Sequence, residues 1–410
     1  MKKRVVVTGI GVIAPNGIGK EAFWNALKEG KSGIKKISFF DASKYPTQIA
    51  GEVRDFVPEN YIDKKKIRRM ARFSQFAVAC AKMALEDAGL EINKVKEEDF
   101  AVILGVSTSA MDLIESQHEK FLKKGPRCIL PFGIFAATPH MGAGEIVAEL
   151  GLPGSVCTLA TGCASGLDAV GIAYGKISRG EIKVSLAGGV DAPITPLLMA
   201  GLCASRIMSA NNDEPEKASR PFDKLRDGGV LSEGGGVVVL EEFNSALLRN
   251  ANIYGEVVGY GESGEVEQPS VGKGLENAMS RAITNANLSP DVITHISAHA
   301  PSDTLLDYIE TESIKSVFGK GAYKIPITSI KSMVGNPFGG IGGFQISAAL
   351  LTLTKGIIPP TINYEYFDPK CDLDYTPQKA RFYEVEYLLI NSHGFGGSNS
   401  SLMLKKYREK

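Results

Sequence analysis

The chain has 410 residues, of which 44% are hydrophobic and 22% are charged, and its 46 basic and 46 acidic side chains balance. This composition is typical of a globular protein with enough apolar material for a large core. A formal net charge of zero argues against nucleic acid or an anionic membrane as the principal partner, because both require a basic excess.

The first predicted element is a β-strand that begins at Arg4, within MKKRVVVTGIGVIAPNG. Basic residues followed by apolar ones imitate a secretory signal, but the apolar part is rich in valine, contains glycines and is not followed by an A-x-A site. No apolar run approaches the ~18 residues of a membrane span. The six scattered cysteines lack CxxC or zinc spacing, which predicts reduced thiols in a cytoplasmic protein and no metal site.

Further along the chain, strands rich in valine and isoleucine alternate with amphipathic helical patterns. AFWNALKEG and FAVACAKMALEDAG predict helices that end at glycine, whereas FAVILGVST and KVSLAGG predict buried strands. This alternation predicts an α/β protein. Two nucleotide-binding patterns fail: TGIGVIA runs into Pro15 instead of opening a helix, and EGKSG has Asn25 where a phosphate loop needs glycine. We therefore expect no cofactor.

Three segments of the first half recur in the same order in the second half. The pairs are ALEDAGL and AITNANL at 84–90 and 282–288, TGIG and VGYG at 8–11 and 258–261, and two small-residue loops that precede helices at 166–180 and 342–356. The first pair ends a helix on Gly89 or Asn287, residues that tolerate the left-handed conformation. The order predicts two related α/β halves that meet near residue 250, although chance similarity would explain any single pair.

Cys163 is the first candidate for a reactive group, within ATGCASGLDAVGIA. Leu167, Val170, Tyr174 and Ile177 lie on one side of the predicted helix behind it, which is consistent with packing against a sheet. Cys163 would then occupy the first turn, where free N–H groups and the helix dipole favour a thiolate. An inert core cysteine is the alternative that this stretch leaves open.

A nucleophilic thiol needs hydrogen-bond or acid–base partners, and four of the five histidines suggest different roles. His118 lies in a polar helical stretch and is expected in solvent, and His295 lies inside a strand and is expected to be structural. His299 follows that strand at its C-terminal end, where α/β proteins gather catalytic groups. His393 lies in NSHGFGGSNSS, whose glycines let the backbone approach a ligand.

Six segments spread over the whole chain carry a family pattern. They are RVVVTGIGV, ARFSQFAVACAKMALEDAGL, SRPFDKLRDGGVLSEGGGVVVLEE at 219–242, KSMVGN at 331–336, PPTINYE at 359–365 and NSHGFGGSNSSL near the end. In these segments the chain resembles the β-ketoacyl-acyl-carrier-protein synthases of the thiolase superfamily, in particular the elongating condensing enzymes of type II fatty acid synthesis. The resemblance implies the thiolase fold, a duplicated five-layer αβαβα sandwich, in which residues 1–250 carry the nucleophile and residues 251–410 carry its partners.

The resemblance also implies roles for the matching residues. Cys163 would take an acyl group from a thioester of acyl carrier protein or coenzyme A, and its N–H and that of Phe395 would form the oxyanion hole. A carbanion from a decarboxylating malonyl thioester would then attack the acyl group, with His299 stabilising the enolate. Lys331 and the acidic Glu310 match the family as well, and an ion pair between them is expected.

Asp307 is the other acidic residue that matches the family, next to Glu310 in the same stretch. The family is usually homodimeric, so a homodimer is implied here too. As functions, the resemblance implies an acyltransferase that condenses acyl and malonyl units in fatty acid or polyketide-type biosynthesis. The alternatives are an acyltransferase or chain-initiating variant with a non-standard donor or acceptor, and a non-catalytic partner subunit of a synthase.

Several residues depart from the family pattern. Asn336 stands where the elongating enzymes have a second histidine; it donates a hydrogen bond but exchanges no proton. A Cys-His-Asn set is the one that initiating, coenzyme A-primed condensing enzymes use. Pro301 and Asp303 replace two threonines that hold the phosphopantetheine arm. Gln345 replaces glutamate, and His393 replaces phenylalanine and would supply an imidazole near Cys163.

Overall fold

The computed structural model describes residues 2–151, 154–265 and 272–409. Its main sheet consists of two arrays with the same connectivity, and two small sheets of two strands each lie apart from it. The first array is β1 (Val5–Ala14), β8 (Gly234–Glu242), β7 (Val184–Asp191), β5 (Phe100–Gly105) and β6 (Ser155–Leu159) in spatial order; the second is β9 (Gly255–Gly264), β15 (Ser398–Lys405), β14 (Tyr387–Gly394), β10 (His295–Ser297) and β11 (Ile327–Thr328). In each array the first three strands pair antiparallel and the last three pair parallel. The arrays join where β1 pairs with β9.

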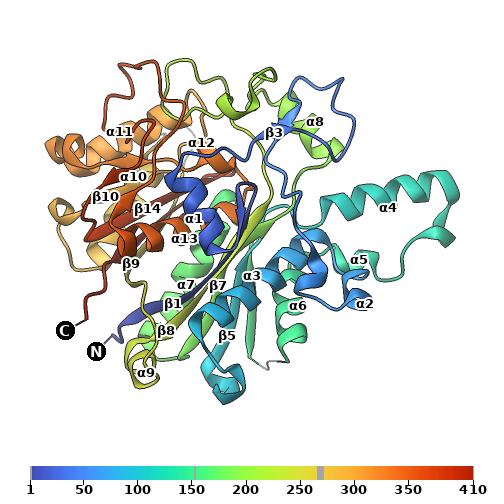
Figure 1. Cartoon of the computed structure of the whole chain (residues 1–410), viewed down its shortest axis with the longest axis horizontal. Helices are drawn as coiled ribbons and strands as arrows, with labels where there is room; N and C mark the ends of the chain where they lie inside the picture. The colour runs from blue at the N-terminus through green and yellow to red at the C-terminus, as the bar shows by residue number, and fades with distance from the viewer. Residues whose placement is uncertain (1, 152–153, 266–271, 410) are drawn as a thin grey trace.

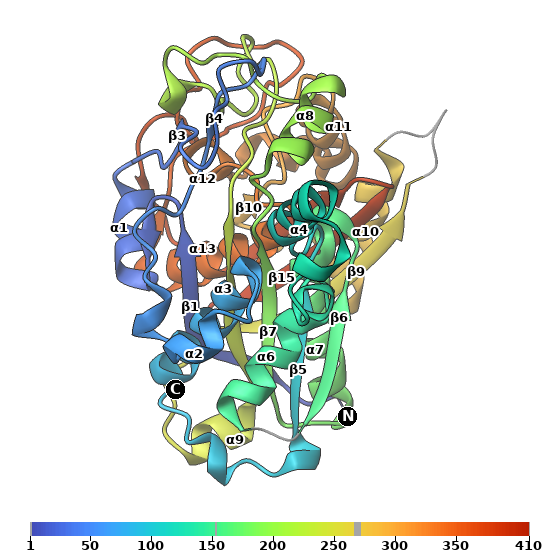
Figure 2. The ribbon, with the colours of Figure 1, turned by 90° about the vertical axis from the view of Figure 1, so that its right-hand side faces the viewer.

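Helices cover both arrays and fill the space between them, as Figures 1 and 2 show. Helix α3 (Arg72–Ala88) packs on β1 and β8, and α10 (Lys273–Asn285) packs on β9 and β15. Helices α7 (Ser165–Arg179) and α13 (Gly340–Lys355) lie side by side in the middle and contact strands of both arrays. The expected five-layer arrangement of an α/β protein is therefore confirmed.

The sequence repeats occupy equivalent places in the two arrays. A Cβ at Gly11 would lie 1.9 Å from a carbonyl of α3, and a Cβ at Gly261 would lie 2.3 Å from a carbonyl of α10, so glycine lets strand and helix meet in both. Helix α3 ends at left-handed Gly89, and the N–H of the next residue reaches back to Leu85 O at 3.2 Å. Asn287 ends α10 with the same bonding. The two helix ends are the same motif in both halves.

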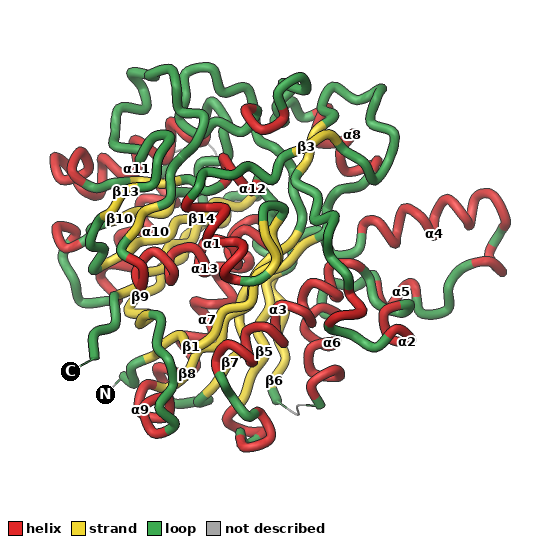
Figure 3. Tube along the Cα trace, viewed as in Figure 1, coloured by secondary structure: helices red, strands yellow, loops and turns green. Residues whose placement is uncertain are grey.

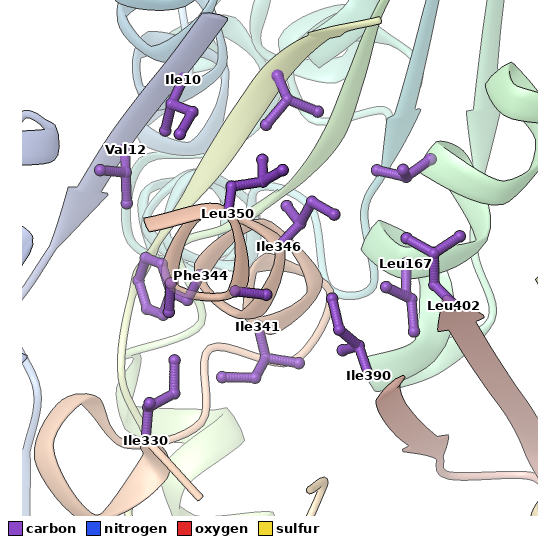
Figure 4. Packing of buried hydrophobic residues seen from close by; sticks show 14 of the residues in the cluster. Ile10, Val12, Leu167, Ile330, Ile341, Phe344, Ile346, Leu350, Ile390 and Leu402 are labelled. Atoms are coloured by element: carbon purple, nitrogen blue, oxygen red, sulfur yellow. The ribbon is translucent and has the colours of Figure 1, made fainter. Parts of the chain in front are cut away.

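One hydrophobic core serves both halves. Figure 4 shows Ile10 and Val12 of β1, Leu167 of α7, and Ile390 and Leu402 of the second array around the side chains of α13. Helix α13 belongs to the second half of the sequence but packs mainly on β7 and β8 of the first. We propose the division into residues 1–250 and 251–410 as a sequence repeat, and the shared core argues that neither half folds alone.

The two outer edges of the sheet differ. Strand β6 pairs only with β5 among the described residues, and Ser155, Val156 and Cys157 are exposed on it. The other edge, β11, is buried, and Ile327 N donates to Asp374 O of a covering loop at 2.7 Å. Long loops gather at one end of the molecule (Figure 3). Within the described residues, no helix has the length and apolar character needed to cross a membrane.

Candidate active site

The predicted site residues lie at the carboxyl ends of the parallel strands, where loops can bring them together. Cys163 follows β6 in the short turn Gly162–Ala164 that leads into α7. His299 follows β10, and Asn336 follows α12 (Lys331–Val334) on the β11 side. One pocket is lined by Cys163, His299, Asn336, His393 and Phe395. The structure therefore brings together residues separated by more than 200 positions.

Cys163 is buried at the start of a helix. Burial raises the pKa of its thiol to about 11, which the Asn336 amide and the Lys331 charge partly oppose, while Asp191 acts in the same direction as burial. Asn336 Nδ2 lies 3.6 Å from Cys163 Sγ. The helix dipole adds a further preference for the thiolate. The resting cysteine is thus a neutral thiol. Its thiolate would be stabilised by the Asn336 amide, by the Lys331 charge and by the helix dipole.

The backbone of the nucleophile turn contacts the 394–397 loop directly. A Cβ at Gly394 would lie 2.2 Å from Thr161 O, and a Cβ at Gly162 would lie 3.1 Å from Phe395 N. Ser392 Oγ also donates to Cys163 O at 3.0 Å. Only glycine fits this contact, and it places the Phe395 N–H beside the turn that carries Cys163.

His299 is buried and held in one tautomer. Lys331 Nζ donates to His299 O and lies 3.4 Å from His299 Nδ1. Because the amine is a donor, Nδ1 accepts and the ring proton resides on Nε2. Burial, then the Lys331 charge and His393, hold the pKa of His299 well below its usual value. His299 is therefore a neutral hydrogen-bond donor toward the pocket.

The expectation of an ion pair between Lys331 and Glu310 is wrong. Glu310 accepts from His299 N at 2.9 Å and from Ala300 N at 2.7 Å, and Asn391 Nδ2 donates to it at 3.0 Å. These donors occupy both carboxylate oxygens, so Lys331 bonds to His299 instead. Burial lowers the pKa of Lys331 to about 8, although the nearby Cys163 and Glu310 partly oppose this.

Asp307 faces away from His299, toward the 220–226 loop. Asp307 Oδ2 accepts from Phe222 N at 2.8 Å and lies 3.7 Å from Arg226 Nε. Arg226 also donates to Asp303 O at 3.2 Å. Burial raises the pKa of Asp307 to about 7. This residue therefore fixes the 220–226 loop.

Asn336 and His393 complete the polar lining. Asn336 N donates to Val230 O at 2.8 Å, which anchors its backbone, and its Oδ1 has no hydrogen-bond partner among the described residues. His393 Nδ1 lies 2.7 Å from Asn399 Oδ1, so His393 carries its proton there and offers Nε2 as an acceptor. The rings of His299 and His393 have centroids 6.0 Å apart. The pocket thus holds one imidazole donor and one imidazole acceptor.

The other pocket walls are mostly apolar. They consist of Leu202, Ile207, Met208, Val230, Leu231, Leu306 and Phe338, with Pro301 and Asp303 beside them. Asp303 Oδ1 accepts from Leu305 N and Leu306 N, both at 2.9 Å, so it caps helix α11 (Leu306–Phe318) as well as lining the pocket. These walls suit an apolar chain.

The remaining residues singled out in the sequence lie outside the pocket lining. Gln345 Nε2 donates to Ala298 O at 3.0 Å and to Asn391 O at 3.1 Å, which ties the ends of β10 and β14. His118 is exposed and His295 is buried against Pro326 O at 2.8 Å, as expected. Among the described residues, no group of three or more His, Cys, Asp and Glu side chains is suited to a metal ion.

Asp191, a buried carboxylate at the end of β7, was not among the residues expected at the site. It accepts from Ser107 N at 2.8 Å and Gly339 N at 2.9 Å, and so joins the β5 loop to the start of α13 behind Cys163. Burial raises its pKa to about 6. An aspartate that ends an otherwise apolar strand was the available signal.

Comparisons with known proteins agree along the whole chain. The family model described as Beta-ketoacyl synthase, N-terminal domain, matches residues 2–246, and that of the C-terminal domain matches residues 254–365. The 3-oxoacyl-[acyl-carrier-protein] synthase 2 of Synechocystis sp. is 41% identical, over 99% of each chain. Among solved structures, the ishigamide ketosynthase/chain length factor has a TM-score of 0.94 at 33% identity, and a type II PKS ketosynthase in complex with its acyl-carrier protein has 0.92 at 32%; both cover 100% of each chain.

The raised pKa of Cys163 predicts how the thiol reacts with iodoacetamide. The alkylation rate of Cys163 should rise about tenfold per pH unit between pH 7 and pH 10, because only the thiolate reacts and its pKa is about 11. Asn336→Ala should move this profile to higher pH, whereas Asn285→Ala, an exposed amide on α10, should leave it unchanged. Peptide mass spectrometry measures the rate. A wild-type rate that is flat from pH 8 to pH 10 contradicts the neutral resting thiol.

Proposed function

The chain belongs to the β-ketoacyl synthase family, and on that basis we propose that it is an acyltransferase that condenses thioesters with loss of carbon dioxide. The observation that carries the proposal is the shared pocket of Cys163, His299 and Asn336 with its apolar walls. The pathway would be fatty acid or polyketide-type biosynthesis, which the names of the similar proteins support.

In the first step, Cys163 takes the acyl group. Its sulfur attacks the thioester carbonyl, and the developing oxyanion accepts hydrogen bonds from the N–H groups of Cys163 and Phe395. Such donors act in a site largely closed to water, where each contributes about 3–4 kcal/mol to the transition state. The carrier thiol leaves with the proton that Cys163 gives up, and the acyl group remains on Sγ.

In the second step, a malonyl thioester loses its carboxylate as carbon dioxide. The electron pair forms an enolate, whose oxygen accepts hydrogen bonds from His299 Nε2 and Asn336 Nδ2. The enolate carbon attacks the acyl carbonyl, a carbon–carbon bond forms, and Cys163 leaves as a thiolate that takes up one proton. A neutral His299 suits this role because it donates without having to lose a positive charge.

Asn336 changes the electrostatics of this step. An amide donates to the enolate at any pH near neutrality, whereas a second imidazole beside Lys331 would share its charge and its protons. Lys331 is then the main source of positive charge in the pocket. We infer that the enolate is stabilised by neutral donors at short range and by one cation behind His299.

The acyl donor is proposed to be a thioester of acyl carrier protein or of coenzyme A. The structurally similar ketosynthase in complex with its acyl-carrier protein supports the first. Pro301 and Asp303 line the pocket, and neither offers the hydroxyl of a threonine. The phosphopantetheine arm would therefore be bound through different contacts. We also propose a cytoplasmic location, in keeping with six free cysteines, all within the described residues.

We propose a homodimer that forms at strand β6. Its outer edge offers unpaired backbone groups, which proteins seldom leave open to solvent. The arm with α4 (Met111–Lys124) and α5 (Gly133–Ala136) projects from the body in Figure 1. Large apolar side chains are exposed on this arm: Ile114, Phe121, Leu122, Leu130, Phe132, Ile134 and Phe135. An isologous contact would pair β6 with its copy and cover these side chains.

If an acyl-enzyme forms, the mass of the intact protein should increase by one acyl group. Incubation with acyl-acyl carrier protein or acyl-coenzyme A should add one acyl group to the intact protein, on the peptide that contains Cys163, and Cys163→Ala should show none. Labelled malonyl thioester should then release carbon dioxide together with a β-ketoacyl product. If no donor acylates the wild-type protein, the proposed function is wrong; a stable adduct without decarboxylation would support plain acyl transfer instead.

Substitutions of Asn336 should show whether this position needs a hydrogen-bond donor, which a histidine also supplies, or the amide itself. Asn336→Ala should slow condensation about 10²- to 10³-fold, the usual loss for one oxyanion donor. Asn336→His restores a ring N–H and should recover the wild-type rate of malonyl decarboxylation or exceed it. The rates are measured as carbon dioxide release on the acylated enzyme. A decarboxylation rate for Asn336→His no higher than that of Asn336→Ala would mean that this position requires the amide itself.

If β6 pairs with its own copy, the protein should be a dimer in solution. Sedimentation equilibrium should give about twice the 43.8 kDa mass of the chain. Val156→Lys should shift the protein toward the monomer, because it places a charge on the edge of β6. Leu248→Lys, which alters a side chain 88% exposed on α9 (Phe243–Leu248), is the control and should leave the mass unchanged. A wild-type monomer at micromolar concentration would contradict the proposal.

A further inference from the structure

A buried carboxylate lies directly behind the nucleophile turn. Asp168, in the first turn of α7, is 5% exposed and accepts hydrogen bonds from three hydroxyl groups. Thr161 Oγ1 donates to Oδ2, and Ser400 Oγ and Tyr260 OH donate to Oδ1, the last at 2.8 Å. No cation pairs with Asp168 within 4 Å in the part of the chain that the structure describes. The carboxylate is thus held by hydroxyl groups and by the N-terminal end of its own helix.

The three hydroxyls come from three separate segments. Thr161 is two residues before Cys163, Ser400 lies on β15 just after the 394–397 loop, and Tyr260 lies on β9 in the second half of the chain. The Tyr260 ring packs over Gly171 of α7, where an added Cβ would lie 2.3 Å from the ring. Asp168 therefore joins the turn before the nucleophile to the strand after the glycine loop.

This junction bears on the geometry of the proposed oxyanion hole. Thr161 O is the atom that a Cβ at Gly394 would meet at 2.2 Å, and Phe395 N lies next to Gly162. A shift of Thr161 therefore moves the nucleophile turn relative to the Phe395 N–H. Ser392 restrains the same two segments from the other side, through its bond to Cys163 O.

We propose that Asp168 is a positioning residue that sets the distance between the two N–H donors of the oxyanion hole. A charged acceptor suits this task, because hydrogen bonds to an ionised group are shorter and stronger than neutral ones. The bonds from Thr161 and Ser400 carry most of the effect. Tyr260 contributes less, since its single proton is shared with Glu262 Oε2, also 2.8 Å from the phenol oxygen.

This inference rests on the proposed function, because it concerns acyl transfer to Cys163. Two reactions of the same sulfur separate positioning from general damage. Acylation by a thioester passes through an oxyanion and needs both N–H donors, whereas alkylation by iodoacetamide displaces iodide at a saturated carbon and needs neither. A displacement of the donors should slow acylation alone.

The test compares the two rate constants in the full-length protein. Asp168→Ala should lower the acylation rate constant about 10²-fold, as expected for a displacement of about 1 Å, and change alkylation less than about threefold. Thr161→Val and Ser400→Ala should each give a smaller loss with the same selectivity, and Tyr260→Phe the smallest. Ser313→Ala, which removes a buried hydroxyl on α11 that donates to Gly272 O at 2.9 Å, is the matched control and should change neither rate.

The outcomes separate the two proposals. Acylation by Asp168→Ala at the wild-type rate, or an equal loss of acylation and alkylation, overturns the positioning role while the proposed function stands. If Asp168→Ala does not fold, Ser400→Ala and Thr161→Val decide by the same criterion. If the wild-type protein accepts no acyl group from any thioester, the proposed function fails, and this inference fails with it.

Discussion

The site depends on one close backbone contact, between the turn that carries Cys163 and the loop from Gly394 to Gly397. Glycine is required on both sides, because a Cβ at Gly394 or Gly162 would meet the opposing backbone. The contact brings together segments from the two halves of the chain and fixes where an oxyanion could be bound. The hydrogen bond from Ser392 Oγ to Cys163 O restrains the same two segments.

The chemistry of the pocket follows from the burial of ionisable side chains that have no partner of opposite charge among the described residues. Lys331 is buried and bonds to His299 rather than to a carboxylate, which lowers the pKa of the amine to about 8 and keeps the imidazole neutral. Cys163 is equally buried and rests as a thiol. The reaction therefore begins with a neutral thiol and a neutral imidazole, and negative charge that develops on the substrate meets preorganised donors instead of mobile water.

The α/β class and the two related halves could be predicted from the sequence because their signals are local, whereas the five-layer arrangement was implied by the family resemblance. Gly89 and Asn287 at the two helix ends, and paired glycines in β1 and β9, are visible as a repeat before any coordinate is known. The site residues were recognisable from motifs. The partners of Lys331 and the hydroxyls around Asp168 were not, because these hydrogen bonds, whether from a near residue such as Thr161 or a distant one such as Ser400, depend on side-chain directions that spacing does not encode. Glu310 looked like a counter-ion and proved to be an acceptor for backbone N–H groups.

The unequal edges of the sheet have a consequence for assembly. The two arrays share one connectivity, yet among the described residues only the first ends in an exposed strand; β11 of the second is closed by the loop that contains Asp374. If both edges were open, chains could add end to end without limit and form fibres. In the proposed dimer, pairing of β6 with its own copy would cover the one exposed edge that the described part of the main sheet offers. Growth would then stop at two subunits, and the covered edge at β11 would prevent further polymerisation.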